Sequence, residues 1–174
     1  MRFWLFALFP LILFSFANLY ATDWREFQPS SGAFKVLFPK TPSHFHNQIP
    51  EGNATDRLKC DVYVSANADV TYMMLVADFP KELSQHQEML SIEGFMQAML
   101  KDQKEEHRLL FANPLHVQGH AGMDFLMKSR QDHFFKGRVM ASASKLYLLT
   151  VESALEQFQE EDYKIFVNSF VLLP

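Results

Sequence analysis

The stretch Arg57-Leu58-Lys59-Cys60-Asp61-Val62-Tyr63-Val64-Ser65 has the cleanest two-residue alternation of apolar and polar side chains in the chain. Because successive side chains of a β-strand point to opposite faces, this alternation predicts a strand with one buried face. The even positions from 58 to 64, Cys60 among them, are predicted to face the core, and the odd ones, Tyr63 among them, to face outward. After a short connection, residues 70–79 are almost continuously apolar, as in a central strand covered on both faces.

Two segments change from a strand period to a helical one. After Pro80, apolar residues recur three or four positions apart, which indicates an amphipathic helix. Near the C-terminus, Phe158, Ile165, Phe166, Ser169 and Phe170 are predicted to share one face of a second helix, with acidic residues on the other face. The first helical stripe consists of Met89, Ile92, Met96, Met99 and Leu100.

Strand patterns occur on both sides of the first helix. They cover residues 24–27, 34–38, 43–49, 108–117, 123–128, 134–142 and 146–151. Short turn segments join the later ones, so hairpins and an antiparallel sheet are expected. The order predicts an α+β fold: a single antiparallel sheet of about six to eight strands flanked by two main helices as an α-β-α sandwich, in one domain over residues 22–174.

Four motifs, taken in order, resemble the PsbP-like fold family, which includes many exported bacterial proteins of unknown role. They are residues 32–39 (GAFKVLFP), 117–125 (VQGHAGMDF), 145–148 (KLYL) and 166–170 (FVNSF). The resemblance implies the same α-β-α arrangement and a role as a small scaffold or assembly partner. That family has no shared catalytic residues, so the resemblance assigns no catalytic, cofactor-binding or metal-binding residue to this chain.

The first 21 residues have the layout of a secretory signal peptide. Arg2 precedes an apolar run, residues 3–17, that is short for a membrane span. We expect cleavage between Ala21 and Thr22. Leu19 is large for its position in such a site, so cleavage after Ala17 stays open. The alternative is an uncleaved signal that anchors the protein in the inner membrane through residues 3–19.

Charge and cysteine content exclude several classes of function. The formal net charge is −4, and −5 once Arg2 is removed, with Lys and Arg scattered along the chain. This charge argues against nucleic-acid binding, which needs clustered cations. Cys60 is the only cysteine, so neither an intramolecular disulfide nor a thiolate zinc site can form within one chain. We expect Cys60 to be buried and inert.

Two groups of polar residues are candidate sites. His44 and His46 would project from the same side of a strand as a metal pair, although two exposed histidines near a turn explain them equally well. Imidazoles and a carboxylate could bind zinc or copper, and such residues cluster in sequence at His116, His120, Asp124 and His133.

Catalytic motifs are absent from the sequence. There is no Gly-x-Ser-x-Gly, no His-Glu-x-x-His and no phosphate-binding glycine loop. Ser142 and Ser144 lie beside a predicted turn and have no evident base in the sequence. We therefore expect no catalytic, cofactor or metal residue.

The sequence as a whole predicts a non-enzymatic, exported accessory or interaction protein of the bacterial envelope, either periplasmic or secreted. Its expected partner is an unidentified protein, with no nucleic acid, and with membrane contact only through an uncleaved signal. One alternative is a metal-binding or enzymatic domain that uses His116, His120, Asp124 and His133. The other is a signal-anchored membrane protein.

Overall fold

The computed structural model describes residues 23–50, 57–67, 69–79, 84–101, 108–129 and 132–174. The predicted signal peptide and the Ala21/Thr22 cleavage site lie outside the described residues. Among the described residues, no helix is long and apolar enough to span a membrane.

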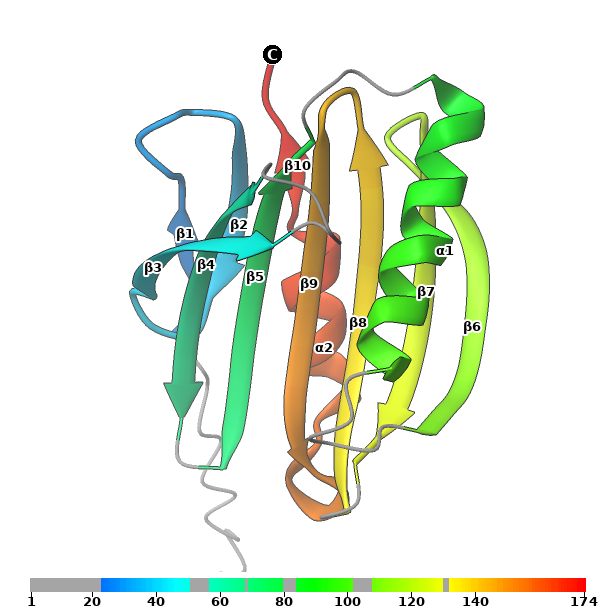
Figure 1. Cartoon of the computed structure of the whole chain (residues 1–174). Helices are drawn as coiled ribbons and strands as arrows, with labels where there is room; N and C mark the ends of the chain where they lie inside the picture. Colours follow the sequence, from blue (N-terminus) through cyan, green and yellow to red (C-terminus); the bar gives the residue numbers. More distant parts are fainter. Residues whose placement is uncertain (1–22, 51–56, 68, 80–83, 102–107, 130–131) are drawn as a thin grey trace, which may run out of the picture.

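Seven antiparallel strands form the main sheet (Figure 1). From one edge to the other the order is β3 (Ser43–Pro50), β4 (Arg57–Asn67), β5 (Val70–Asp78), β9 (Lys145–Ala154), β8 (His133–Ser142), β7 (His120–Lys128) and β6 (Arg108–Val117). The pairing of β5 with β9 joins the strands that precede the first helix to those that follow it. The predicted α+β class and antiparallel pairing are confirmed.

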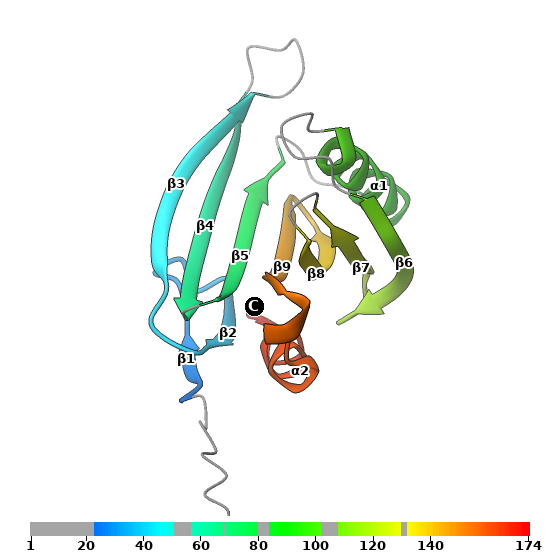
Figure 2. The same ribbon diagram turned by 90° about the horizontal axis from the view of Figure 1, so that it is seen from below.

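A second, smaller sheet accompanies the main one. It consists of β1 (Arg25–Phe27), β2 (Phe34–Phe38) and β10 (Val171–Leu172), with β2 in the middle. A 3-10 turn (Leu155–Gln157) precedes the second helix, α2 (Glu160–Asn168). Thus the predicted early strands and the C-terminal segment pack as a layer of their own, beside α2 rather than in the main sheet (Figures 1 and 2).

The two faces of the main sheet have separate cores. On the α1 face, helix α1 (Gln85–Lys101) packs on β7 and β8, and Ile92 and Met96 are buried there. On the α2 face, α2 and the small sheet pack against residues such as Tyr72 and Met74. The view from below shows α1 and α2 on opposite sides of the strands (Figure 2).

Strand β4 contributes to both cores, which corrects one prediction. Cys60 is 1% exposed and lies in the α1-face core, as predicted. Tyr63, predicted to face outward, is only 7% exposed and packs against Phe27 and Phe34 on the α2 face. The reason is the small sheet: it covers the face that the alternation alone assigned to solvent.

The predicted stripe of α1 packs in the α1-face core. At the start of α1, the Ser84 backbone N–H donates to the Gln87 side chain at 2.9 Å, which is one half of a capping box.

The predicted face of the second helix is correct only in part, because Phe158, Ser169 and Phe170 lie outside α2. In α2 the buried residues are Tyr163, Phe166 and Val167, whereas Ile165 is 39% exposed. The helical repeat of 3.6 residues places Ile165 roughly opposite that face, which explains its exposure.

Candidate functional site

The four residues of the predicted histidine cluster are separated in the fold. His120 lies at the start of β7, whereas His133 lies at the opposite end of the sheet, where it pairs with Ala154. His116 pairs with Ala121, which belongs to the α1-face core. Among the described residues, no group of three or more His, Cys, Asp or Glu side chains is arranged to hold a metal ion.

Asp124 is engaged in an ion pair on the α2 face. Its two carboxylate oxygens accept from Arg138 Nε at 2.7 Å and Arg138 Nη2 at 3.0 Å, a two-point arrangement. Arg138 also donates to Asn168 at the end of α2. The bond to Asp124 raises the pKa of Arg138. Asp124 therefore joins β7 to β8 and holds Arg138 where it can contact α2, which is a structural task.

Substitution of Asp124 by asparagine is expected to lower the free energy of unfolding by about 1–3 kcal/mol, because it leaves a half-buried guanidinium without its carboxylate. Urea denaturation measures this loss. The matched control is Glu152→Gln, which breaks the more exposed contact to His133 at 3.6 Å and should cost less than about 1 kcal/mol. Equal stability of Asp124→Asn and the wild type would contradict the structural role.

His44 and His46 share one carboxylate on the neighbouring strand. Their ring nitrogens lie 2.8 and 3.1 Å from the same oxygen of Asp61, which confirms that they project from one side of β3. Burial alone would raise the pKa of Asp61, but the two histidine contacts outweigh it and lower this pKa. His44 also stacks on Tyr63 with ring centroids 4.6 Å apart. The histidines thus pair with protein groups at a half-exposed surface.

Cys60 has the surroundings predicted for an inert thiol. Burial is the main cause that raises its pKa, and the nearby Asp78 and Asp61 raise it further. Both effects disfavour the thiolate, which is the reactive form. The structure therefore gives no support for a nucleophilic role of Cys60.

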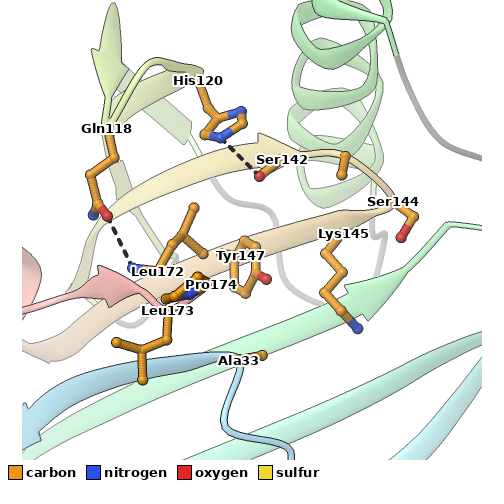
Figure 3. Close-up of a pocket in the computed structure, with 11 residues that line it drawn as sticks. Ala33, Gln118, His120, Ser142, Ser144, Lys145, Tyr147, Leu172, Leu173 and Pro174 are labelled. Carbon is orange, nitrogen blue, oxygen red and sulfur yellow. Dashed lines mark hydrogen bonds between the residues drawn. The ribbon is translucent and has the colours of Figure 1, made fainter.

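A cavity of about 570 Å³ lies at the end of the sheet where β7 begins and β8 ends (Figure 3). The β8–β9 hairpin supplies polar lining residues, and the last three residues of the chain supply apolar ones. The lining consists of Ala33, Gln118, His120, Ser142, Ala143, Ser144, Lys145, Tyr147, Leu172, Leu173 and Pro174.

Gln118 fixes the C-terminal wall of this cavity. It begins the tight β6–β7 turn with Gly119, and both have positive φ (51° and 86°), as the primed hairpin turns require. Its side chain donates to the carbonyl of Phe170 and accepts from the N–H of Leu172, each at 3.0 Å. The turn therefore ties β10 and the residues after it to the start of β7 (Figure 3).

Three polar side chains form a continuous hydrogen-bonded series that runs from the cavity lining into the protein interior. Ser142 Oγ lies 3.1 Å from His120 Nε2, and His120 Nδ1 lies 3.2 Å from a carboxylate oxygen of Glu88. The other oxygen of Glu88 accepts from the backbone N–H of Ala121 at 3.3 Å. Glu88 is 4% exposed, whereas the His120 side chain is about one-third exposed and faces the cavity.

The sequence points to two members of this series and misses the third. In the sequence, His120 is a candidate metal ligand and Ser142 is a serine without an evident base. In the fold, His120 Nε2 lies within hydrogen-bond distance of Ser142 Oγ. Glu88 comes from the first turn of α1, 32 residues before His120. An acidic residue is common in the first turn of a helix, so no local signal distinguishes Glu88 from a surface residue.

Two further residues give the cavity its polarity. Lys145, directly opposite Ser142 in the β8–β9 pairing, forms an ion pair with Asp78. Burial, with a smaller effect of Asp78, raises the pKa of Tyr147 to about 12. Its phenol therefore stays neutral at physiological pH and can serve as a hydrogen-bond donor.

A second candidate surface is the apolar part of the α1 face beyond helix α1. Phe45 on the edge strand β3 is 57% exposed, and its partner across β4 is Val62. Val62 in turn pairs with Leu75, and the next pair on the same face is Val64 with Met73. We call Phe45, Val62, Val64, Met73 and Leu75 the β3–β5 patch. The last four are partly buried.

Comparison of the whole chain with known proteins identifies solved structures that share its fold. No protein-family model matches the chain, and no curated protein sequence matches it. The solution structure of cyanobacterial PsbP (CyanoP) from Synechocystis sp. PCC 6803 matches with a TM-score of 0.61 at 12% identity, over 92% of this chain and 99% of that one.

Two other solved structures match with lower TM-scores. A protein of unknown function from Pseudomonas aeruginosa, PA94, gives 0.48 at 9% identity, over 87% of this chain and 98% of that one. The Saccharomyces cerevisiae Ran-binding protein Mog1p gives 0.44 at 11% identity, over 87% and 96%. At the identity of the CyanoP match, similarity shows the fold alone. The chain therefore has the PsbP-like fold, as its sequence motifs predicted.

Proposed function

We propose that this chain is an exported accessory protein of the bacterial envelope that works by binding an extended apolar segment of another protein along β3. The observation that carries the proposal is the exposure of Phe45, an aromatic side chain on the edge strand of the sheet. Its neighbours in the β3–β5 patch extend the apolar surface away from that edge.

The position of Phe45 favours an extended segment as the ligand. In the described part of the sheet, β3 pairs with β4 on one side and ends the strand order on the other. The outer edge of such a strand offers backbone donors and acceptors to an added strand, and alternate side chains of that strand would lie over the sheet face. An exposed aromatic side chain beside partly buried aliphatic ones is a typical anchor for such contacts.

Replacement of Phe45 by aspartate is expected to weaken partner binding by at least about 2 kcal/mol, roughly thirtyfold, because it places a charge in an apolar contact. The measurement is crosslinking and pull-down from the native envelope fraction, followed by titration of the captured protein. The control is Leu155→Asp, which changes an equally exposed apolar residue (64%) outside the patch.

A partner retained by Leu155→Asp and lost by Phe45→Asp supports the proposal. The same set of partners for both variants and the wild type contradicts it. Thermal unfolding of both variants should match the wild type, because both side chains are more than half exposed.

Export is the second part of the proposal, and the layout of residues 1–21 supports it. N-terminal sequencing of the native protein tests it together with carbonate washing of membranes. A chain that starts at Thr22 or Asn18 in the soluble fraction is the expected result. An intact N-terminus in the washed membranes would instead favour the signal-anchored alternative.

A further inference from the structure

We propose that Ser142, His120 and Glu88 form a catalytic centre for acyl transfer, with Ser142 as the nucleophile, and that it hydrolyses short-chain carboxylic esters bound in the adjoining cavity. This activity is independent of the proposed binding at β3, because the two sites use different strands and different side chains. It would also overturn the prediction of a non-enzymatic protein.

The hydrogen bonds of His120 leave its Nε2 unprotonated and facing Ser142, as a general base requires. A carboxylate only accepts hydrogen bonds, so Glu88 fixes the proton of the neutral imidazole on Nδ1. The lone pair on Nε2 then accepts from the hydroxyl of Ser142 at 3.1 Å. A nucleophile within 2.6–3.2 Å of a base that a third group orients is the arrangement that defines this chemistry on unrelated folds.

Burial of Glu88 gives the series its rigidity. The carboxylate is 4% exposed, and each of its oxygens has a defined donor, His120 Nδ1 on one and the Ala121 N–H on the other. A solvated surface carboxylate would exchange these partners for water. Here the carboxylate is a positioning group for the imidazole, whose Nε2 contacts Ser142 on the cavity side (Figure 3).

The cavity determines the class of substrate. Its volume of about 570 Å³ lies within the usual range for small-molecule sites, about 300–1,000 Å³. Tyr147, Leu172 and Leu173 offer apolar surface for an acyl chain. Lys145 is the cationic residue of this lining and forms an ion pair with Asp78.

The reaction balances with water as the only co-reactant. Ser142 Oγ attacks the ester carbonyl carbon while its proton passes to His120 Nε2. The C–O bond to the alcohol then breaks, and the alcohol leaves with that proton, which gives an acyl-serine. Water attacks the acyl carbon, again losing a proton to His120, and the carboxylic acid and the free hydroxyl of Ser142 are released.

The test is covalent labelling of the purified full-length chain with a fluorophosphonate, which a nucleophilic serine attacks with loss of fluoride. We expect wild-type protein to be labelled at Ser142 and Ser142→Ala to lose at least about hundredfold in labelling rate. The matched control is Ser43→Ala, which changes an exposed serine outside this lining and should keep the wild-type rate. Hydrolysis of p-nitrophenyl butyrate should follow the same order.

Glu88→Gln tests the positioning role through a readout that a purely structural role would not change. An amide replaces one of the two accepting oxygens by an NH₂ donor, so either His120 Nδ1–H or the Ala121 N–H would face a donor in place of its acceptor. We expect labelling to fall at least about tenfold and the ¹⁵N spectrum of the imidazole to change from the Nδ1–H form to a mixture of tautomers.

Three results would overturn the proposal. They are a wild-type protein labelled no faster than the heat-denatured chain, Ser142→Ala labelled at the wild-type rate, and Ser43→Ala as impaired as Ser142→Ala. Circular dichroism confirms that each variant is folded. If Glu88→Gln does not fold, the two serine variants still test whether Ser142 is the nucleophile. Both change only a small side chain and should fold.

Discussion

Replacement of Phe166 by alanine is expected to lower the free energy of unfolding by about 3–5 kcal/mol. The side chain is 0% exposed, and its ring lies 5.2 Å from that of Phe38 and 5.5 Å from that of Tyr72. Phe166 thus connects α2 with the small sheet and with β5 of the main sheet. Its loss leaves a cavity where three layers meet, and this arrangement cannot collapse without moving a strand.

Urea denaturation at equilibrium measures the loss, and Ile165→Ala is the matched control on the same helix. Ile165 is 39% exposed, and alanine is the better helix former, so this variant should differ from the wild type by less than about 1 kcal/mol. Similar losses for the two variants would contradict the assignment of the buried face of α2.

The second large effect is expected at Gly137 in β8, where alanine should cost about 1–3 kcal/mol or more. A Cβ atom there would lie 2.7 Å from the carbonyl oxygen of Leu149, from the ring of Phe125 and from a methyl group of Thr150. The first of these is backbone in the adjacent central strand and cannot move aside by a rotamer change. Glycine is therefore required by the close approach of β7, β8 and β9.

Gly94→Ala is the control for this prediction, because the same substitution should have the opposite sign there. Gly94 lies inside α1, and a Cβ atom would meet nothing within 4 Å. Alanine should raise the stability by about 0.5–1 kcal/mol, since glycine loses more conformational entropy in a helix. Urea denaturation of both variants measures the two changes in stability. A Gly137→Ala protein as stable as the wild type would contradict the close packing described around Gly137.

The sequence predicted the elements well where the pattern was local. The alternation at Cys60 and the helical stripe through Ile92 and Met96 are both confirmed by burial. Periodicity works in these cases because each side chain follows the geometry of its own strand or helix. It failed at Tyr63, because a separate layer, the small sheet, covers that position.

The candidate sites show more clearly that local sequence patterns do not predict contacts between separate elements. His116, His120, Asp124 and His133 are close in sequence, yet the antiparallel register distributes them over opposite ends of the sheet. Ser142 and Glu88 are 54 residues apart in sequence, yet both contact His120. Proximity along a strand says little about a site that is built where several elements end.

The sequence by itself determined the α+β class, the antiparallel pairing, the two amphipathic helices and the inward position of Cys60, because these depend on side-chain period and on short connections. Only the tertiary structure decided that Asp124 binds Arg138, that the C-terminal residues close a cavity against Gln118, and that Glu88 orients His120 toward Ser142. The contact of Asp124 with Arg138 depends on the register of the β7–β8 hairpin, and the others join segments more distant in the chain. Their distance in space is set by strand order and helix docking, which no local pattern encodes.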